Sequence, residues 1–301
     1  MKRLAFCFLL LLPAAPSAFA WGVLGHLISN EAATFGLPND MPAFFYRSFP
    51  ELVYLGPDPD RWNGNGESLD AVNLPDHYLD FEYVEGLDLP RDRYKFIALL
   101  NTSGVQERHR LKPAQPGFLP WRIAELSELL TAQFRLWRRS EPNSPDRRAI
   151  ERGIIEIAGL LGHYVADAAN PHHTTMSHNG WVGPNPNGYA IDCETHRRFE
   201  SDFVSHTVVT SDVVSRMPAP VLRSDYFATA VALVRSSHAL VETLYTIDHE
   251  GGFDLMHPSE RGKDFAANRL ASGASLLRDL WWSAWKNSAA PPPKRQQPPP
   301  E

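Results

Sequence analysis

GHYVADAANPHHTTMSHNGWVGPNPNGYAIDCETHRRFE, residues 162–200, contains two pairs in which a histidine is followed four positions later by an acidic residue. The pairs are His163 with Asp167 and His196 with Glu200. Residues four apart on an α-helix lie on one face, so each pair would present an imidazole beside a carboxylate. Any one of these side chains alone is more readily explained as a hydrogen-bonded core residue than as a metal ligand. Their joint spacing instead predicts a metal site, and the donor set suits zinc.

The residues around the first pair predict a buried helix. Residues 154–161 are mostly apolar, and Asn170-Pro171 ends the helix because a residue that precedes proline disfavours helical geometry. A further histidine, His173, follows this break. A carboxylate is costly to bury in such a helix, and a bound cation would offset that cost for Asp167.

Apolar residues recur at helical spacing along most of the chain, and no useful length shows the alternation typical of strands. We therefore expect an all-α fold, a single multi-helical domain over residues 21–288 with a metal cleft between helices. Residues 289–301 are rich in proline and predict a disordered tail. The helices are expected over residues 27–35, 41–54, 91–110, 120–139, 147–169, 194–209, 226–247 and 262–286.

Residues 1–20 have the features of a cleaved signal peptide. A positively charged start precedes an apolar core over residues 4–12, and Ala18-Phe19-Ala20 is a small-x-small cleavage site. The apolar core is too short to span a bilayer as a helix, and no later stretch is long enough. We therefore expect a secreted or periplasmic protein without stable membrane insertion.

The net charge of -6, with dispersed basic residues, argues against a broad surface that tracks a phosphate backbone. It leaves room for a small pocket that binds a phosphate ester. After cleavage Cys193 is the one remaining cysteine, so no intrachain disulfide can form. No protein partner is inferred.

Cleavage after Ala20 would make Trp21 the new N-terminus. Its free amine and adjacent carbonyl oxygen can chelate one metal, and His26 can supply a third ligand. The simpler interpretation is that Trp21 anchors the N-terminus in the core and that His26 is a surface residue. Further along, a proline-rich turn carries Asp58 and Asp60, and His77 is weak evidence on its own.

The order of these candidates resembles the zinc-dependent phospholipase C superfamily, which also contains the secreted single-strand-specific zinc nucleases. Three features carry the resemblance: the tryptophan exposed by cleavage, the His-x-x-x-Asp-x-x-x-x-x-His motif that ends at His173, and the final His-x-x-x-Glu pair. The resemblance spans residues 21 to about 204 and is closest to the bacterial phospholipase C branch. The candidates in chain order are Trp21, His26, Asp58, His77, His163, Asp167, His173, His196 and Glu200.

The resemblance implies three zinc ions in a cleft of a helical domain. One ion would be held by Asp58, His77, His163 and Asp167. A second would be held by the amine and carbonyl of Trp21, by His26 and by a bridging Asp167. A third would be held by His173, His196 and Glu200. The first acid stays open, because Asp60 is two residues from Asp58.

The resemblance further implies that the ions activate a water molecule for in-line attack on the phosphorus of a phosphodiester. Asp58 and Asp167 are the candidate catalytic residues: Asp58 would orient or deprotonate the water, and Asp167 would bridge two ions. The glutamate of the final pair favours a phospholipid or a related small phosphodiester. The fungal-type nucleases carry an aspartate there, so a single-strand-specific endonuclease or 3'-nucleotidase is the alternative.

Phe81, Trp181 and Tyr189 are candidate substrate-binding residues for either substrate, since the same rings can hold an acyl chain or a base. The second alternative is a secreted zinc-binding helical protein without catalysis. The complete ligand set argues against this alternative.

Overall fold

The computed structural model describes residues 21–292. The expected signal peptide, residues 1–20, and residues 293–301 of the expected tail lie outside the described residues. Within the described part of the chain every regular element is helical, and one hydrophobic core joins them. The expectation of a single all-α domain is confirmed. No helix in this part of the chain combines the length and the apolar character needed to cross a membrane.

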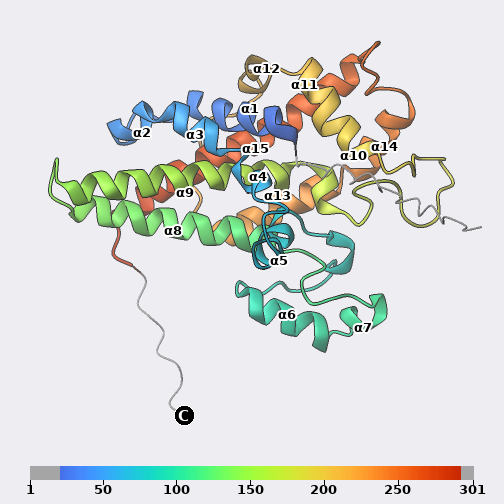
Figure 1. Ribbon diagram of the computed structural model, residues 1–301, viewed down its shortest axis with the longest axis horizontal. Helices are drawn as coiled ribbons and strands as arrows, with labels where there is room; N and C mark the ends of the chain where they lie inside the picture. Colours follow the sequence, from blue (N-terminus) through green and yellow to red (C-terminus); the bar gives the residue numbers. More distant parts are fainter. Residues whose placement is uncertain (1–20, 293–301) are drawn as a thin grey trace, which may run out of the picture.

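The helices follow one another along the chain and are labelled as in Figure 1. Their bounds are α1 (Gly22–Phe35), α2 (Ala43–Arg47), α3 (Phe49–Leu55), α4 (Asp58–Arg61), α5 (Glu67–Asn73), η1 (Leu74–His77), η2 (Phe81–Tyr83), α6 (Arg93–Thr102), α7 (Val105–His109), α8 (Leu119–Arg139), α9 (Pro145–Ala169), η3 (Pro171–Thr174), α10 (Thr195–Arg197), the π-helical turn η4 (Arg198–Phe203), α11 (Val204–Thr207), α12 (Thr210–Val214), α13 (Tyr226–His238), α14 (Val241–His249) and α15 (Glu260–Asn287).

Three long helices form the frame of the molecule. α8 and α9 form a hairpin joined by a short loop, and α15 packs against both (Figure 1). The indole of Trp281 on α15 is fully buried, and its Nε1 donates to the carbonyl oxygen of Ala158 on α9 at 3.0 Å. Large buried rings of this kind supply much of the free energy of a helical core. In this frame the C-terminal half of α9, from Ala158 onward, is buried without interruption.

Several expected helices are interrupted, for local reasons. The helix expected over 41–54 divides into α2 and α3, with Pro50 in the first turn of α3, where its missing N–H is tolerated. The helix expected over 91–110 divides at Gly104, whose φ of 71° is left-handed. The helix expected over 226–247 divides between α13 and α14.

Two glycines of α9 allow α1 and α3 to approach closely. A Cβ atom added at Gly159 would lie 2.5 Å from Cβ of Leu55, and one at Gly162 would lie 1.9 Å from Oδ1 of Asn30. The amide of Asn30 donates to carbonyl oxygens of both neighbouring helices, at Leu52 and at Gly159. This contact brings α1, with its His26, against the face of α9 that carries His163.

Candidate metal centre

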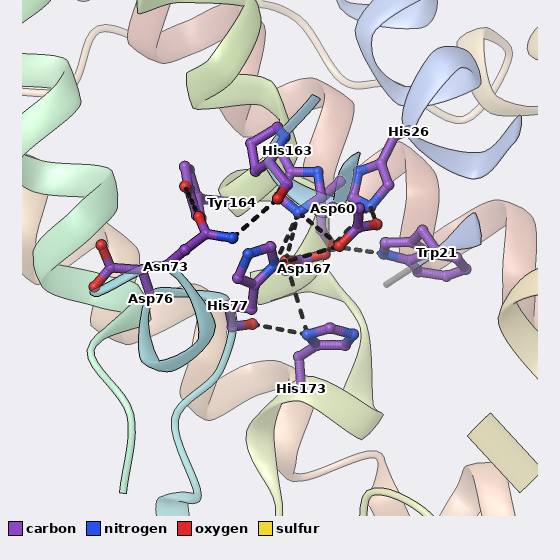
Figure 2. Close-up of polar contacts among 12 residues, drawn as sticks. Trp21, His26, Asp60, Asn73, Asp76, His77, His163, Tyr164, Asp167 and His173 are labelled. Carbon is purple, nitrogen blue, oxygen red and sulfur yellow. Dashed lines mark hydrogen bonds and ion pairs between the residues drawn. The ribbon is translucent and has the colours of Figure 1, made fainter. Parts of the chain in front are cut away.

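The C-terminal turns of α9 place His163 and Asp167 on one buried face, and His26, Asp60, His77 and His173 approach them from other segments (Figure 2). Among the described residues, three groups have nitrogen and oxygen atoms that all lie within 4.8 Å of one another. The groups are His26, His163 and Asp167; Asp60, His77 and His163; and His173, His196 and Glu200. Every member is buried.

The first two groups share His163 and form one continuous cluster. Nε2 of His163 lies 2.9 Å from Nδ1 of His77 and 3.3 Å from Oδ2 of Asp167. Nε2 of His26 lies 3.5 Å from the other oxygen of Asp167, and the rings of His26 and His163 stack with centroids 3.9 Å apart. The two oxygens of Asp167 therefore face different histidines, an arrangement that suits a carboxylate bridging two cations.

The structure corrects the acid of the first group: Asp60, not Asp58, reaches the cluster. Residues two apart on a helical turn point to opposite sides, so α4 can turn inward only one of its aspartates. Asp60 is 3% exposed, and its carboxylate lies 3.6 Å from the ring nitrogens of both His77 and His163. Asp58 faces outward and pairs with Arg61.

The third group has the membership expected from the sequence. Nε2 of His196 lies 2.8 Å from Oε2 of Glu200 and 3.2 Å from Nε2 of His173. Glu200 lies in the π-helical turn η4, a kind of turn that is frequent at functional sites. Nδ1 of His173 also lies 3.8 Å from Oδ2 of Asp167, which connects this group to the other two.

The backbone nitrogen of Trp21 lies at Glu200 of the third group, whereas the resemblance placed it at the second ion with His26 and Asp167. It donates to Oε2 of Glu200 at 2.9 Å, and the buried indole donates through Nε1 to the carbonyl oxygen of Ala166. The interpretation of Trp21 as a buried anchor and its interpretation as a ligand are therefore compatible. The indole holds the start of the described chain so that its nitrogen points into the cluster.

Hydrogen bonds from the backbone set which nitrogen of two imidazoles faces the cluster. A carbonyl oxygen only accepts, so Nδ1 of His163 must donate to Gly56 and Nδ1 of His173 must donate to the carbonyl oxygen of His77. In the neutral rings this leaves the Nε2 lone pairs directed at the cluster. Metal-binding histidines are oriented in the same way, by a donor bond from the other nitrogen.

Buried carboxylate oxygens provide a second test of the fit to a cation. Oδ2 of Asp60, Oδ1 of Asp167 and Oε1 of Glu200 are buried and accept no hydrogen bond. Three carboxylates buried together are costly without compensating positive charge. Lone-pair nitrogens and unsatisfied carboxylate oxygens at these distances fit divalent cations, and the mixture of nitrogen and oxygen donors suits zinc.

The shifts in pKa reflect the same crowding of charge. Burial raises the pKa of Asp60 to about 7, and the nearby Asp167 and Glu200 add to the rise. Burial alone would lower the pKa of His173, but Asp167 and Glu200 outweigh it and raise that pKa to about 9. Burial would raise the pKa of Asp167, but His163 and His173 outweigh it and hold this pKa well below its usual value. In the metal-free protein, a proton on His173 therefore balances part of the negative charge of the carboxylates.

A cavity of about 440 Å³ opens beside the cluster. Four of its lining residues belong to the three groups, and the others include both polar and apolar side chains. The lining residues are Asp60, Asn63, Leu74, His77, Tyr78, Asp80, Gln115, His172, His173, His178 and His196.

The aromatic residues expected to bind substrate do not line this cavity. Phe81 is buried beside His238, while Trp181 and Tyr189 pack on each other and on Tyr245. The wall is formed instead by segments next to His77, including Tyr78. Gln115, far along the chain, also lines the cavity. The spacing of residues in the sequence could not reveal it, because the chain folds back there and Asp80 N–H donates to the carbonyl oxygen of Pro116.

No family model and no curated protein sequence matches the chain. Among solved structures, the alpha toxin of Clostridium absonum matches with a TM-score of 0.45 and 13% identity. The match covers 89% of this chain and 66% of the toxin. An alpha-toxin of Clostridium perfringens from avian strain SWCP matches with a TM-score of 0.44 and 14% identity, over 89% of this chain and 64% of the toxin. The function is therefore inferred from the site itself.

Proposed function

We propose that this chain is an exported zinc-dependent hydrolase of phosphoric diesters, with a phospholipase C-type substrate. One observation carries the proposal: three groups of buried histidines and carboxylates meet beside one cavity. The two oxygens of Asp167 face different histidines, and the third group has its own ligands, which supports a centre with more than one ion. The motif resemblance supplies the expectation of zinc and of a phosphodiester.

Bound zinc would lower the pKa of a water molecule and neutralise a phosphodiester group. The chain's own residues prepare the site for this chemistry. The imidazoles of His163 and His173 are fixed by backbone carbonyls before any cation arrives. The site thus avoids reorganisation of these ligands during the reaction.

Asp60 takes the role first assigned to Asp58. It lines the cavity, and its buried carboxylate lies 3.6 Å from the ring nitrogens of His77 and His163, where it can orient a water molecule. In the proposed reaction Asp60 orients the attacking water and takes its proton. Asp167 stays ionised, which suits a carboxylate that holds two cations.

The proposal is tested on a chain that begins at Trp21, with its bound metal measured by mass spectrometry. Rates are compared on bis-p-nitrophenyl phosphate, phosphatidylcholine vesicles and single-stranded DNA, before and after chelation and after zinc is restored. We expect hydrolysis of the soluble diester and of the lipid, lost on chelation and regained with zinc. Cleavage of DNA alone would establish the nuclease alternative, and tight zinc without hydrolysis would establish the non-catalytic one.

A second arm tests the terminal amine. A chain with extra residues before Trp21 would still place an amide nitrogen beside Glu200 but would lack the free amine. We expect it to bind less metal and to lose most activity. Equal metal content in the two chains would exclude the amine as a ligand.

A further inference from the structure

Asn73 immediately precedes η1, and its side chain bonds to the turn around α4 and to α9; these three segments supply the Asp60, His77 and His163 group (Figure 2). Its Nδ2 donates to the carbonyl oxygen of Pro59 at 2.9 Å and to Oδ1 of Asn63 at 2.8 Å. Its Oδ1 accepts from the hydroxyl of Tyr164 at 3.3 Å. Asn73 is 4% exposed, and all of these bonds are made by its side chain.

Two of these three segments are too short to be stable as isolated helices. α4, which carries Asp60, has four residues, and so has η1, which carries His77. Helical pieces of this length do not persist without tertiary contacts, because few backbone hydrogen bonds offset the cost of nucleation. The two acceptors of Asn73 in the first segment lie on either side of Asp60 in sequence, so the amide fixes that turn from both ends.

Tyr164 connects the same amide to the rings of the two histidines. Its ring lies edge to face with His163, at a centroid distance of 5.3 Å, and with His77, at 5.5 Å. It is almost completely buried, and the guanidinium of Arg122 lies over the ring at 5.2 Å. The bond from its hydroxyl to Asn73 therefore couples the orientation of both imidazoles to the turn that carries Asp60.

We infer that Asn73 is a positioning residue that sets the geometry of the Asp60, His77 and His163 group for a metal ion. The inference rests on the proposed metal dependence. Asn73 belongs to none of the three groups and does not line the cavity; it acts through Pro59, Asn63 and Tyr164. Partners one step removed from a metal ligand typically change metal affinity by about 10- to 100-fold.

The test measures zinc affinity by competition with a chromogenic chelator, not by activity. Asn73→Ala is expected to weaken one class of site by about 10- to 100-fold and leave the others unchanged. Tyr164→Phe keeps the ring and removes only the hydroxyl, so a loss of about fivefold at the same class is expected. Asn287→Ala is the matched control, because that amide also joins a backbone carbonyl, of Arg223, to a tyrosine hydroxyl, of Tyr226, and lies outside the three metal-binding groups.

Double variants identify the class of site. In a His196→Ala background, which disables the third group, Asn73→Ala should keep its full effect. In an Asp60→Asn background it should have almost none, because the site that it positions is already impaired. The melting temperature of the metal-free protein is measured for each variant, since a purely structural role would lower that temperature and leave zinc affinity unchanged.

Unchanged zinc affinity in Asn73→Ala, or an equal loss at all classes of site, overturns the inference. If Asn73→Ala does not fold, Tyr164→Phe decides: a loss confined to one class supports the inference, and wild-type affinity overturns it. Absence of tight zinc from the wild-type chain would overturn the proposed function itself, so the two failures are distinguishable.

Discussion

Asp58 and Asp60 are two residues apart in the four-residue helix α4, and only Asp60 faces the metal centre. The carboxylate of Asp60 lies 3.7 Å from Nε2 of His26 and 3.6 Å from Nε2 of His163. Asp58 forms an ion pair with Arg61 on the other side of the turn. The side chain that can accept a proton beside the cavity is therefore the buried member of the pair.

We predict that Asp60→Asn and Asp58→Asn have very different consequences. Asp60→Asn keeps the shape of the side chain but loses an anionic donor, and should reduce zinc affinity and hydrolysis of a soluble diester at least about 100-fold. Asp58→Asn removes a surface ion pair, which contributes about 0–1 kcal/mol to stability, and should leave activity within about threefold of wild type. Comparable losses of zinc affinity and activity in the two variants would contradict the orientation of α4 in which only Asp60 faces the metal centre.

The sequence was sufficient for the parts of the centre that depend on helical spacing. The pairs of His163 with Asp167 and His196 with Glu200 could be predicted because both members of each pair lie on one short stretch of the chain. The choice between two aspartates in α4 could not, because a proline-rich turn gives no periodicity from which to read a face. The structure resolves this choice through non-local contacts with His77 and His163.

The cavity wall was beyond prediction for a related reason. Tyr78 and Gln115 meet because the chain between them folds out and returns, with Phe118 N–H donating to the carbonyl oxygen of Pro75. Aromatic rings such as that of Trp181 have the right chemistry for a substrate pocket, but their chemistry does not determine their position. They serve instead in a cluster of aromatic rings around Tyr245.

Zinc binding should depend strongly on pH. His173, with a pKa raised to about 9, carries a proton at pH 7 in the metal-free protein, and Asp60, with a pKa of about 7, carries one on part of the molecules. Both protons must leave when a cation binds, so zinc affinity should rise from pH 6 to about pH 9 and then level off. Calorimetry in two buffers with different ionisation enthalpies should detect the released protons. An affinity that is constant over this range would contradict the assignment of these groups as ligands.

A pH-dependent gain in stability is expected for Asp80→Asn. Burial raises the pKa of Asp80 to about 8, and the negative charge of Glu82 adds to the rise. The folded state then binds more protons than the unfolded state between about pH 4 and pH 8, so this group lowers stability progressively as the pH rises through that window. Asp80→Asn should melt close to wild type near pH 5 and at a clearly higher temperature at pH 9, measured with a chelator present.

The control for this prediction is Asp248→Asn. The side chain of Asp248 is only 6% exposed, but both of its oxygens accept from Arg198 at 2.8 Å. Loss of that partner should lower the melting temperature at both pH values. If Asp80→Asn behaves in the same way, Asp80 has an ionised partner at neutral pH and is not a neutral acid.

Gly162→Ala should be strongly destabilising, although alanine is the better helix former. The added Cβ would lie 1.9 Å from Oδ1 of Asn30, whose amide holds two backbone carbonyls, so neither partner can move without breaking contacts. We expect a loss of about 3 kcal/mol in the free energy of unfolding, the upper end of the usual cost of overpacking. Gly153→Ala is the matched control on the same helix, because nothing lies within 4 Å of its added Cβ. That variant should gain about 0.5–1 kcal/mol. Urea unfolding of the metal-free proteins measures both values, and wild-type stability in Gly162→Ala would show that α1 and α9 are not in the close contact that brings His26 to His163.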